Sequence, residues 1–201
     1  MKSTVIEVTS KGGGISEALS LTEKLGIESG IRKKSVIHLR LLAEELFGML
    51  RSIAGDVSAN YWIEYNGPDF ELHLKSTVEL TDKMRDQFIS ASSSGKNDAT
   101  RGVMGKIKVM IANFMFSARE ALPYTLINTP ASYHMGAAAG ETAAMWSMSL
   151  YKDEIKKTGG KKSAEAWDEL EKSIVANIAD DVKVCILGDT VEIIINKTFW
   201  H

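Results

Sequence analysis

The segment from Lys33 to Ile53 constrains the fold most, because it is the longest segment with an unbroken helical period. Its apolar residues recur at spacings of three and four, which predicts a helix with one buried face. These residues are Val36, Leu39, Leu42, Ala43, Leu46, Phe47, Leu50 and Ile53. A helix of this kind needs a second layer to pack against. Glu44 and Glu45 lie in its middle, and their surroundings decide whether they do chemistry or form solvated surface.

Length and composition indicate one ordinary soluble domain. The chain has 201 residues, of which 44% are hydrophobic and 25% are charged. A formal net charge of -2 gives no global electrostatic reason to expect a nucleic acid or an anionic membrane as partner. No apolar run approaches the roughly 18 residues that span a bilayer. We therefore expect a single domain over residues 1–201, with an insertion around residues 100–160.

The chain has a single cysteine, Cys185, so it cannot form an intramolecular disulfide. The N-terminus lacks the order of a signal peptide, which predicts a reducing, cytoplasmic location. Because Cys185 lies in the strand-like run VKVCIL, burial as a small apolar residue is favoured over a role as nucleophile.

Strand signals occur near both ends of the chain. Residues 4–9 are short and β-branched, and residues 59–65 and 70–77 flank the turn sequence NGPD, a strong hairpin signal. A second hairpin is predicted around Gly188 and Asp189, with apolar residues on both faces of its strands, as in central strands.

Four further helices and two irregular regions are predicted between these strands. A helix from Ile15 should stop at Gly26, a short one should follow Thr81, and Val103–Phe116 is strongly amphipathic. Ser163 should cap the last helix, AEAWDELEKSIVANIA. Residues 121–150 are interpreted as an insertion with a short helix, and the polar run KDEIKKTGGKK as a loop.

This order of elements predicts an α+β fold, a two-layer sandwich in which helices cover one face of a mixed β-sheet. Local motifs for chemistry are weak. The run Gly12–Gly14 indicates a flexible turn rather than a phosphate cradle, and TGGKKS lacks the first glycine of a P-loop. The four histidines have no metal-like spacing with each other or with Cys185, so no metal site is predicted.

The chain resembles the GHKL-type ATPase domain in its order of elements and in three segments. These are the run LAEELFGML (Leu42–Leu50), the hairpin after it, and the closing IVANIADDVKV and TVEIIINKTF. The similarity is to the short version found in bacterial anti-sigma factor kinases and sensor histidine kinases. It covers about two-thirds of the chain, and residues 100–160 match poorly.

The resemblance implies a nucleotide-binding site whose sequence motifs are only partly present in this chain. Glu45 occupies the position of the glutamate that acts on the attacking water, but Met49 replaces the asparagine that holds Mg²⁺, and a thioether is a poor ligand for that ion. Ser76 and Thr77 stand where the family has an aspartate and a glycine that recognise adenine. Candidates for the glycine-rich lid are Gly102 with Gly105, and Gly159 and Gly160 with Lys161.

Three functions stay open at this point. The first is a degenerate GHKL-like domain that regulates or binds a protein in bacterial signalling, through the methionine-rich residues 103–150. The second is an ATPase or serine kinase of the anti-sigma factor type that binds ATP and Mg²⁺ in an altered site, with Glu45 as general base and Lys161 or Lys162 near the phosphates. The third is a structural protein with an accidental similarity. A homodimer is compatible with each.

Overall fold

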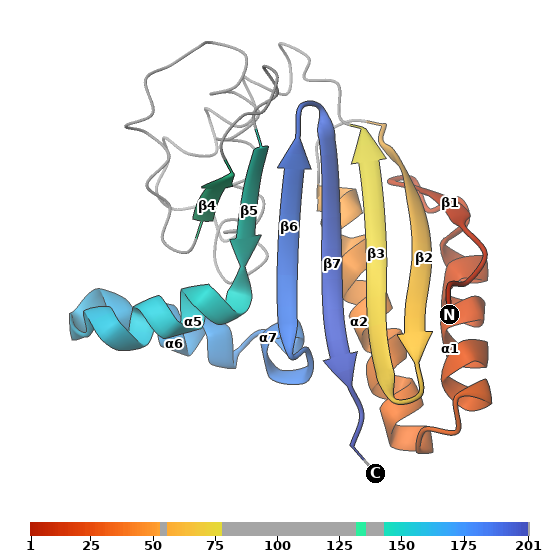
Figure 1. Ribbon diagram of the computed structural model, residues 1–201, viewed down its shortest axis with the longest axis horizontal. Coiled ribbons are helices and arrows are strands. Elements are labelled where there is room, and N and C mark those ends of the chain that lie inside the picture. Colours follow the sequence, from red (N-terminus) through yellow and green to blue (C-terminus); the bar gives the residue numbers. More distant parts are fainter. Residues whose placement is uncertain (53–55, 78–131, 136–142, 201) are drawn as a thin grey trace.

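The computed structural model describes residues 1–52, 56–77, 132–135 and 143–200, and its strands form one seven-stranded sheet (Figure 1). The strand order is β1-β2-β3-β7-β6-β5-β4. The strands are β1 (Ile6–Thr9), β2 (Ser58–Asn66), β3 (Asp69–Thr77), β4 (Ser132–Met135), β5 (Ala143–Ser147), β6 (Asp181–Leu187) and β7 (Thr190–Thr198). The described helices are α1 (Ile15–Glu28), α2 (Lys33–Ser52), α5 (Met148–Thr158), α6 (Gly160–Glu171) and α7 (Ile174–Ile178).

The α+β class is confirmed, but the prediction of a mixed sheet is wrong, because every pair of described strands is antiparallel. Both predicted hairpins form, and β3 of the first pairs with β7 of the second. Hairpins join neighbours in antiparallel fashion, so no crossover helix is needed within either of them. The result is an open antiparallel sheet that can leave one face toward solvent.

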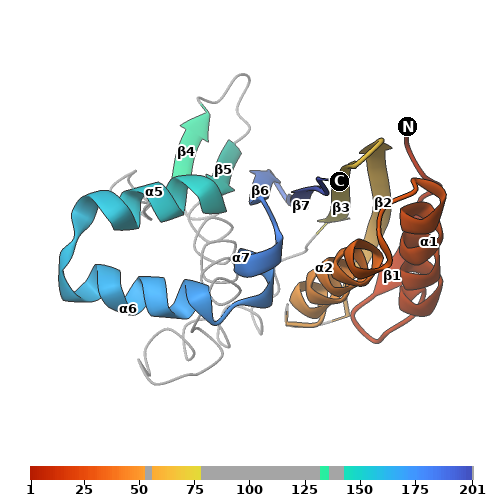
Figure 2. The ribbon, with the colours of Figure 1, turned by 90° about the horizontal axis from the view of Figure 1, so that it is seen from below.

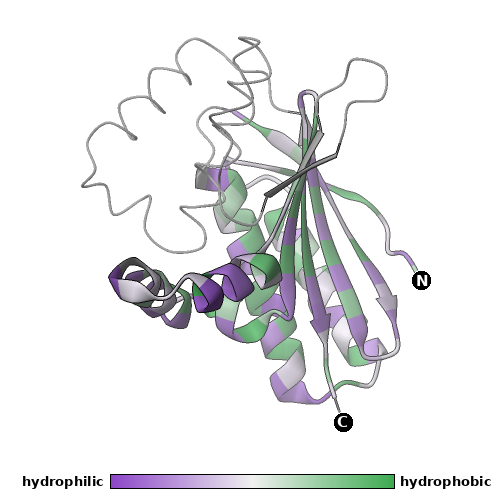
Figure 3. Ribbon diagram, turned by 60° about the vertical axis from the view of Figure 1, so that its left-hand side comes forward, coloured by the Kyte–Doolittle hydropathy of each residue, from purple (hydrophilic) through white to green (hydrophobic). Residues whose placement is uncertain are grey.

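The core lies between the sheet and helices α1, α2 and α7, which Figure 2 shows on one side of the strands. Strand alternation supplies the inner face of the sheet. One row of paired residues, Tyr61, Leu74, Ile193 and Val184, runs across four strands and is buried throughout. Figure 3 shows the corresponding alternation of hydrophobic and hydrophilic residues along the strands.

Helix α2 forms as predicted from its period, and the residues of the predicted apolar face, from Val36 through Leu50, belong to the core. Helix α1 differs from expectation, because Gly26 does not end it. Gly26 is buried inside α1, and a Cβ placed there would lie 3.3 Å from Val36 and 3.4 Å from Leu39 of α2. The glycine thus permits the two helices to approach closely, and the chain leaves the helix only after Glu28.

Residues 143–158 also differ from expectation. Residues 143–147 form β5 and pair with β6, so this part of the expected insertion extends the sheet instead. The helix α5 that follows contains most of the run interpreted as a loop, because Tyr151 and Ile155 are buried at helical spacing among its polar residues. A polar composition here reflects a solvated helix face, not a loop.

The last predicted helix is divided in two. Ser163 does not cap it, since α6 already begins at Gly160 and the Ser163 hydroxyl donates a hydrogen bond to the Gly159 carbonyl at 2.8 Å. Helix α6 ends at Glu171, and Ser173 then caps the separate helix α7 by accepting a hydrogen bond from the Ala176 amide. The apolar period continued across the break and concealed it.

Cys185 is half-buried and belongs to the face of β6 opposite the core, so the expected burial is only partial. Desolvation, followed by the nearby Glu192 carboxylate, raises the pKa of its thiol. The helices predicted after Thr81 and over Val103–Phe116 lie outside the described residues. Of the helices that are described, none combines the length and apolar character needed to cross a bilayer.

Candidate functional site

Helix α2 has two flanks with different chemistry. On the flank toward α1, the Arg40 guanidinium donates hydrogen bonds to Glu23 at 2.8 Å and to Glu44 at 2.9 Å. The two carboxylates raise the pKa of Arg40. Glu44 therefore belongs to an exposed ion-pair network between α1 and α2, a common device with a modest contribution to stability.

Glu45 and Met49 are four residues apart and so share a flank of α2, on the side away from Arg40. Glu45 is half-buried, and no hydrogen bond or ion pair joins it to another described residue. Met49 is only 4% exposed and belongs to the hydrophobic core. The expected catalytic position is thus accessible, whereas the expected metal-ligand position is filled by a buried thioether.

Ser76 and Thr77 lie at the end of β3, which Figure 1 places at the same end of the sheet as the C-terminal end of α2. The Ser76 hydroxyl is buried and donates a hydrogen bond of 2.6 Å to the carbonyl of Ser58 on β2. Thr77 is exposed and faces Thr190 across the pair of β3 and β7. The Ser76 side chain therefore stabilises the pairing of β2 with β3, and the Thr77 side chain is exposed to solvent.

The second lid candidate lies in the connection between α5 and α6. Gly159 and Gly160 both have positive φ angles, of 62° and 84°, so they form the reversal between two helices, and exposed Lys161 follows. Figures 1 and 2 both show the connected ends of α5 and α6 pointing away from α2. The structure does not bring these residues to Glu45. The first candidate, Gly102 with Gly105, is outside the described residues, and so is most of 103–150.

The glycine run before α1 forms a turn, as its composition predicts. The amide of Gly13 donates to the Thr9 hydroxyl at 2.9 Å, and the amide of Gly12 donates to the Thr9 carbonyl at 2.9 Å. These two amides already have partners within the turn. The arrangement supports the connection of β1 to α1 rather than a bound phosphate.

Sequence reasoning missed one group of side chains on the face of the sheet opposite the helices. Glu64 of β2 and Glu71 and His73 of β3 each offer a ligand atom, and these atoms lie within 4.8 Å of one another. The alternation of β3 does place Glu71 and His73 on one face. Glu64 joins them only through the hairpin register, which pairs Glu64 with Glu71 and Trp62 with His73.

Comparisons with protein-family models, with curated proteins and with solved structures find no match for this chain.

Proposed function

We propose that this chain is a regulatory, protein-binding module built on a GHKL-like scaffold and that it does not carry out ordinary Mg²⁺-dependent ATP turnover. The observation that carries the proposal is the burial of Met49. A neutral thioether held in the core cannot supply the hard oxygen donor that Mg²⁺ requires. The burial of Ser76 supports the same conclusion, because its hydroxyl is directed into the sheet, where it donates to the Ser58 carbonyl, and only Thr77 is exposed at this position.

The scaffold part of the proposal rests on the element order. A strand, two helices and a hairpin open the chain, and the short helix α7 leads into the closing hairpin of β6 and β7. Helix α2 packs against β7 and α7, so the first and last parts of the chain share one core. This is the arrangement that the resemblance leads us to expect for the helix bearing Glu45.

Thermal unfolding with and without Mg-ATP tests the proposal. A ligand that binds only the folded state raises the melting temperature by mass action. We expect the melting temperature to stay within error at millimolar Mg-ATP, and phosphate release from ATP to stay at the background level. A rise of several degrees, or ATP hydrolysis above background, would overturn the proposal.

A second candidate, an altered nucleotide site, is favoured by one observation. Glu45 is half-buried, yet no described residue forms a hydrogen bond or ion pair with it, so its carboxylate is free to accept a proton from water as far as the described residues go. The variant Glu45→Gln separates the two functions. Loss of a hydrolysis rate that the wild-type chain shows would favour the enzyme, whereas identical background rates favour the binding module.

The proposed partner surface is the methionine-rich segment 103–150, of which the structure describes residues 132–135 and 143–150. Flexible thioether side chains adapt to apolar partner surfaces. Replacing Met110 and Phe114 by glutamate should reduce the recovery of bound proteins in a pull-down from a bacterial lysate. Circular dichroism must show the wild-type spectrum for the variant. Unchanged recovery by a folded variant would reject this surface.

A further inference from the structure

His73 is held in one orientation on the open face of the sheet. Its ring stacks on that of Trp62, with centroids 4.7 Å apart and planes inclined by 8°. Its Nδ1 lies 2.9 Å from a carboxylate oxygen of Glu192 on the neighbouring strand β7. The residue is only 7% exposed, so both the position and the rotation of the ring are fixed by packing and by this hydrogen bond.

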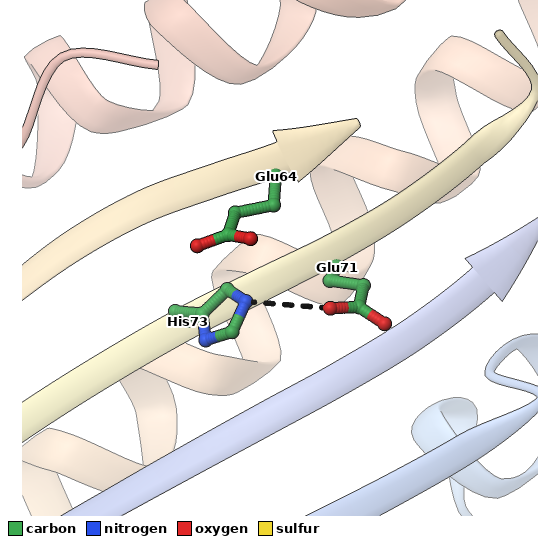
Figure 4. Close-up of side chains that lie close together, drawn as sticks. All are labelled: Glu64, Glu71 and His73. Carbon is green, nitrogen blue, oxygen red and sulfur yellow. Dashed lines mark ion pairs between the residues drawn. The ribbon is translucent and has the colours of Figure 1, made fainter. Parts of the chain in front are cut away.

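The other ring nitrogen of His73 is buried and has no hydrogen-bond partner among the described residues. It points toward the carboxylates of Glu64 and Glu71, as Figure 4 shows, and lies 3.7 Å from Glu71 Oε2. Burying a polar atom without a partner is unfavourable and rare in native proteins. The free Nε2 beside two carboxylates therefore indicates a missing ligand at this point.

The two carboxylates are held in the same way, each through one oxygen. Trp62 Nε1 donates to Glu64 Oε1 at 3.0 Å, and Asn196 Nδ2 donates to Glu71 Oε1 at 2.7 Å. Within the part of the chain that the structure describes, the second oxygen of each accepts no hydrogen bond, and that of Glu71 is the one 3.7 Å from His73 Nε2.

We propose that Glu64, Glu71 and His73 form a binding site for a transition-metal dication such as Zn²⁺. The donor set is one imidazole nitrogen and two carboxylate oxygens, which suits Zn²⁺ better than Mg²⁺ or Ca²⁺. A carboxylate on the far nitrogen of a ligating histidine fixes its tautomer and increases its basicity, and Glu192 stands in that position. The site leaves a fourth position open toward solvent, for water or for a group from a partner.

Only small movements complete the site. Ligands of a tetrahedral Zn²⁺ with bonds of about 2.1 Å are about 3.4 Å apart. The distance of 3.7 Å between His73 Nε2 and Glu71 Oε2 is close to this value, and rotation of the half-exposed glutamates closes the rest. Lys2 is the competing cation, with its Nζ 3.7 Å from Glu64 Oε1 and 4.3 Å from the Trp62 ring centroid.

Titration of the full chain with Zn²⁺ by calorimetry, and with Co²⁺ by visible absorption, tests the site. We expect one ion per chain and a Co²⁺ absorption band in the visible region. His73→Gln and Glu71→Gln should each weaken Zn²⁺ binding at least about tenfold and reduce the Co²⁺ band. Glu192→Gln should weaken binding by about tenfold through the orientation of His73. Lys2→Ala should strengthen it by removing the competing charge.

Matched controls keep the test specific. Glu165→Gln on α6 and His38→Gln on α2 should leave Zn²⁺ affinity unchanged, since neither side chain belongs to the site. Because the Glu71 side chain is half exposed, Glu71→Gln remains informative if His73→Gln fails to fold. Zn²⁺ binding that survives both Glu71→Gln and His73→Gln, or no binding by the wild-type chain, would overturn the proposal and leave an ion-pair network only.

Discussion

At the scale of single residues, Thr22 and Tyr61 form a polar contact inside the core. Both residues are 0% exposed, and their hydroxyl oxygens are 2.8 Å apart. Thr22 donates its proton to the Ala18 carbonyl at 2.7 Å, so Tyr61 must be the donor to Thr22. The contact joins α1 to β2, and the Tyr61 ring meets Phe47 of α2 edge-on, with ring centroids 4.9 Å apart.

Removing either partner of this pair should have unequal effects. Thr22→Val leaves the buried Tyr61 hydroxyl without an acceptor and should lower the free energy of unfolding by about 2 kcal/mol. Tyr61→Phe leaves Thr22 bonded to Ala18 and should cost only about 1 kcal/mol. Urea denaturation of both variants and of the double variant measures these values. If the two single effects add fully in the double variant, the hydrogen bond does not couple the residues.

The same burial makes stability depend on alkaline pH. Burial raises the pKa of Tyr61 above its ordinary value of 10, so the folded chain keeps this proton where the unfolded chain loses it. The stabilisation is complete below pH 10 and is lost as the pH rises toward the folded-state pKa, by about 1.4 kcal/mol per pH unit. Urea denaturation between pH 9 and 11 should show a shallower decline for Tyr61→Phe than for the wild-type chain. Equal slopes would contradict this assignment.

At the scale of elements, the connection of β1 to α1 depends on a backbone conformation that residues with a Cβ atom rarely adopt. Gly14 has a φ of 71°, and a Cβ added there would overlap the carbonyl oxygen of Glu7 on β1. Gly30 also has a φ of 71°, but no atom of the described residues lies within 4 Å of its added Cβ. The two positions thus share a backbone conformation and differ in available space.

Substituting alanine at Gly14 and at Gly30 separates the cost of backbone strain from the cost of a steric clash. Gly30→Ala should cost about 1 kcal/mol, for the left-handed conformation alone. Gly14→Ala should cost at least about 2 kcal/mol more, because the colliding atom is backbone and β1 has to move. Thermal or urea unfolding of both variants gives the comparison. Similar losses of unfolding free energy at Gly14 and Gly30 would show that the connection of β1 to α1 accommodates the added Cβ atom without a further cost.

At the scale of the whole molecule, β3 and β7 lie in the middle of the sheet. These strands pair over their full lengths and join the N-terminal and C-terminal hairpins into one sheet. Helices α5 and α6 extend away from it (Figure 2). Helix α5 is connected to the sheet through β5 and through the hydrogen bond from the Ser149 amide to Asp181 of β6, and Lys152 donates to the Ala176 carbonyl of α7 at 3.0 Å. We infer that the two parts open with different free energies.

Native-state hydrogen exchange measures this difference. Amides of β3 and β7 should exchange last, at the rate set by global unfolding, because both strands have neighbours on each side. Amides of α5 and α6 should exchange earlier, by local opening. Equal protection of α5, α6 and the central strands would indicate a single cooperative unit instead.

The amino-acid sequence by itself determined the elements with strong local patterns. The period of Lys33–Ser52, the NGPD turn and the alternation in β6 and β7 specify a buried helix and two hairpins, because spacing alone decides which side chains share a face. The sequence did not predict the elements whose local patterns were ambiguous. Polar residues 152–158 and the short run 143–147 carry weak signals. Pairing with β6 gave residues 143–147 their strand structure, and the burial of Tyr151 and Ile155 fixed the helix over residues 152–158.

Tertiary structure alone decided the sheet order and what lies beside each candidate residue. The sequence placed Glu45 and Met49 on one helix flank, but only packing shows that Met49 is in the core while Glu45 is half-buried. Alternation placed Glu71 and His73 on one face of a strand, but the sequence did not bring Glu64 to them. Glu64 meets the other two only through hairpin register, and Glu192, distant in sequence, reaches His73 through the pairing of β3 with β7. Contacts between distant segments depend on how the whole core packs, and no local sequence pattern specifies that packing.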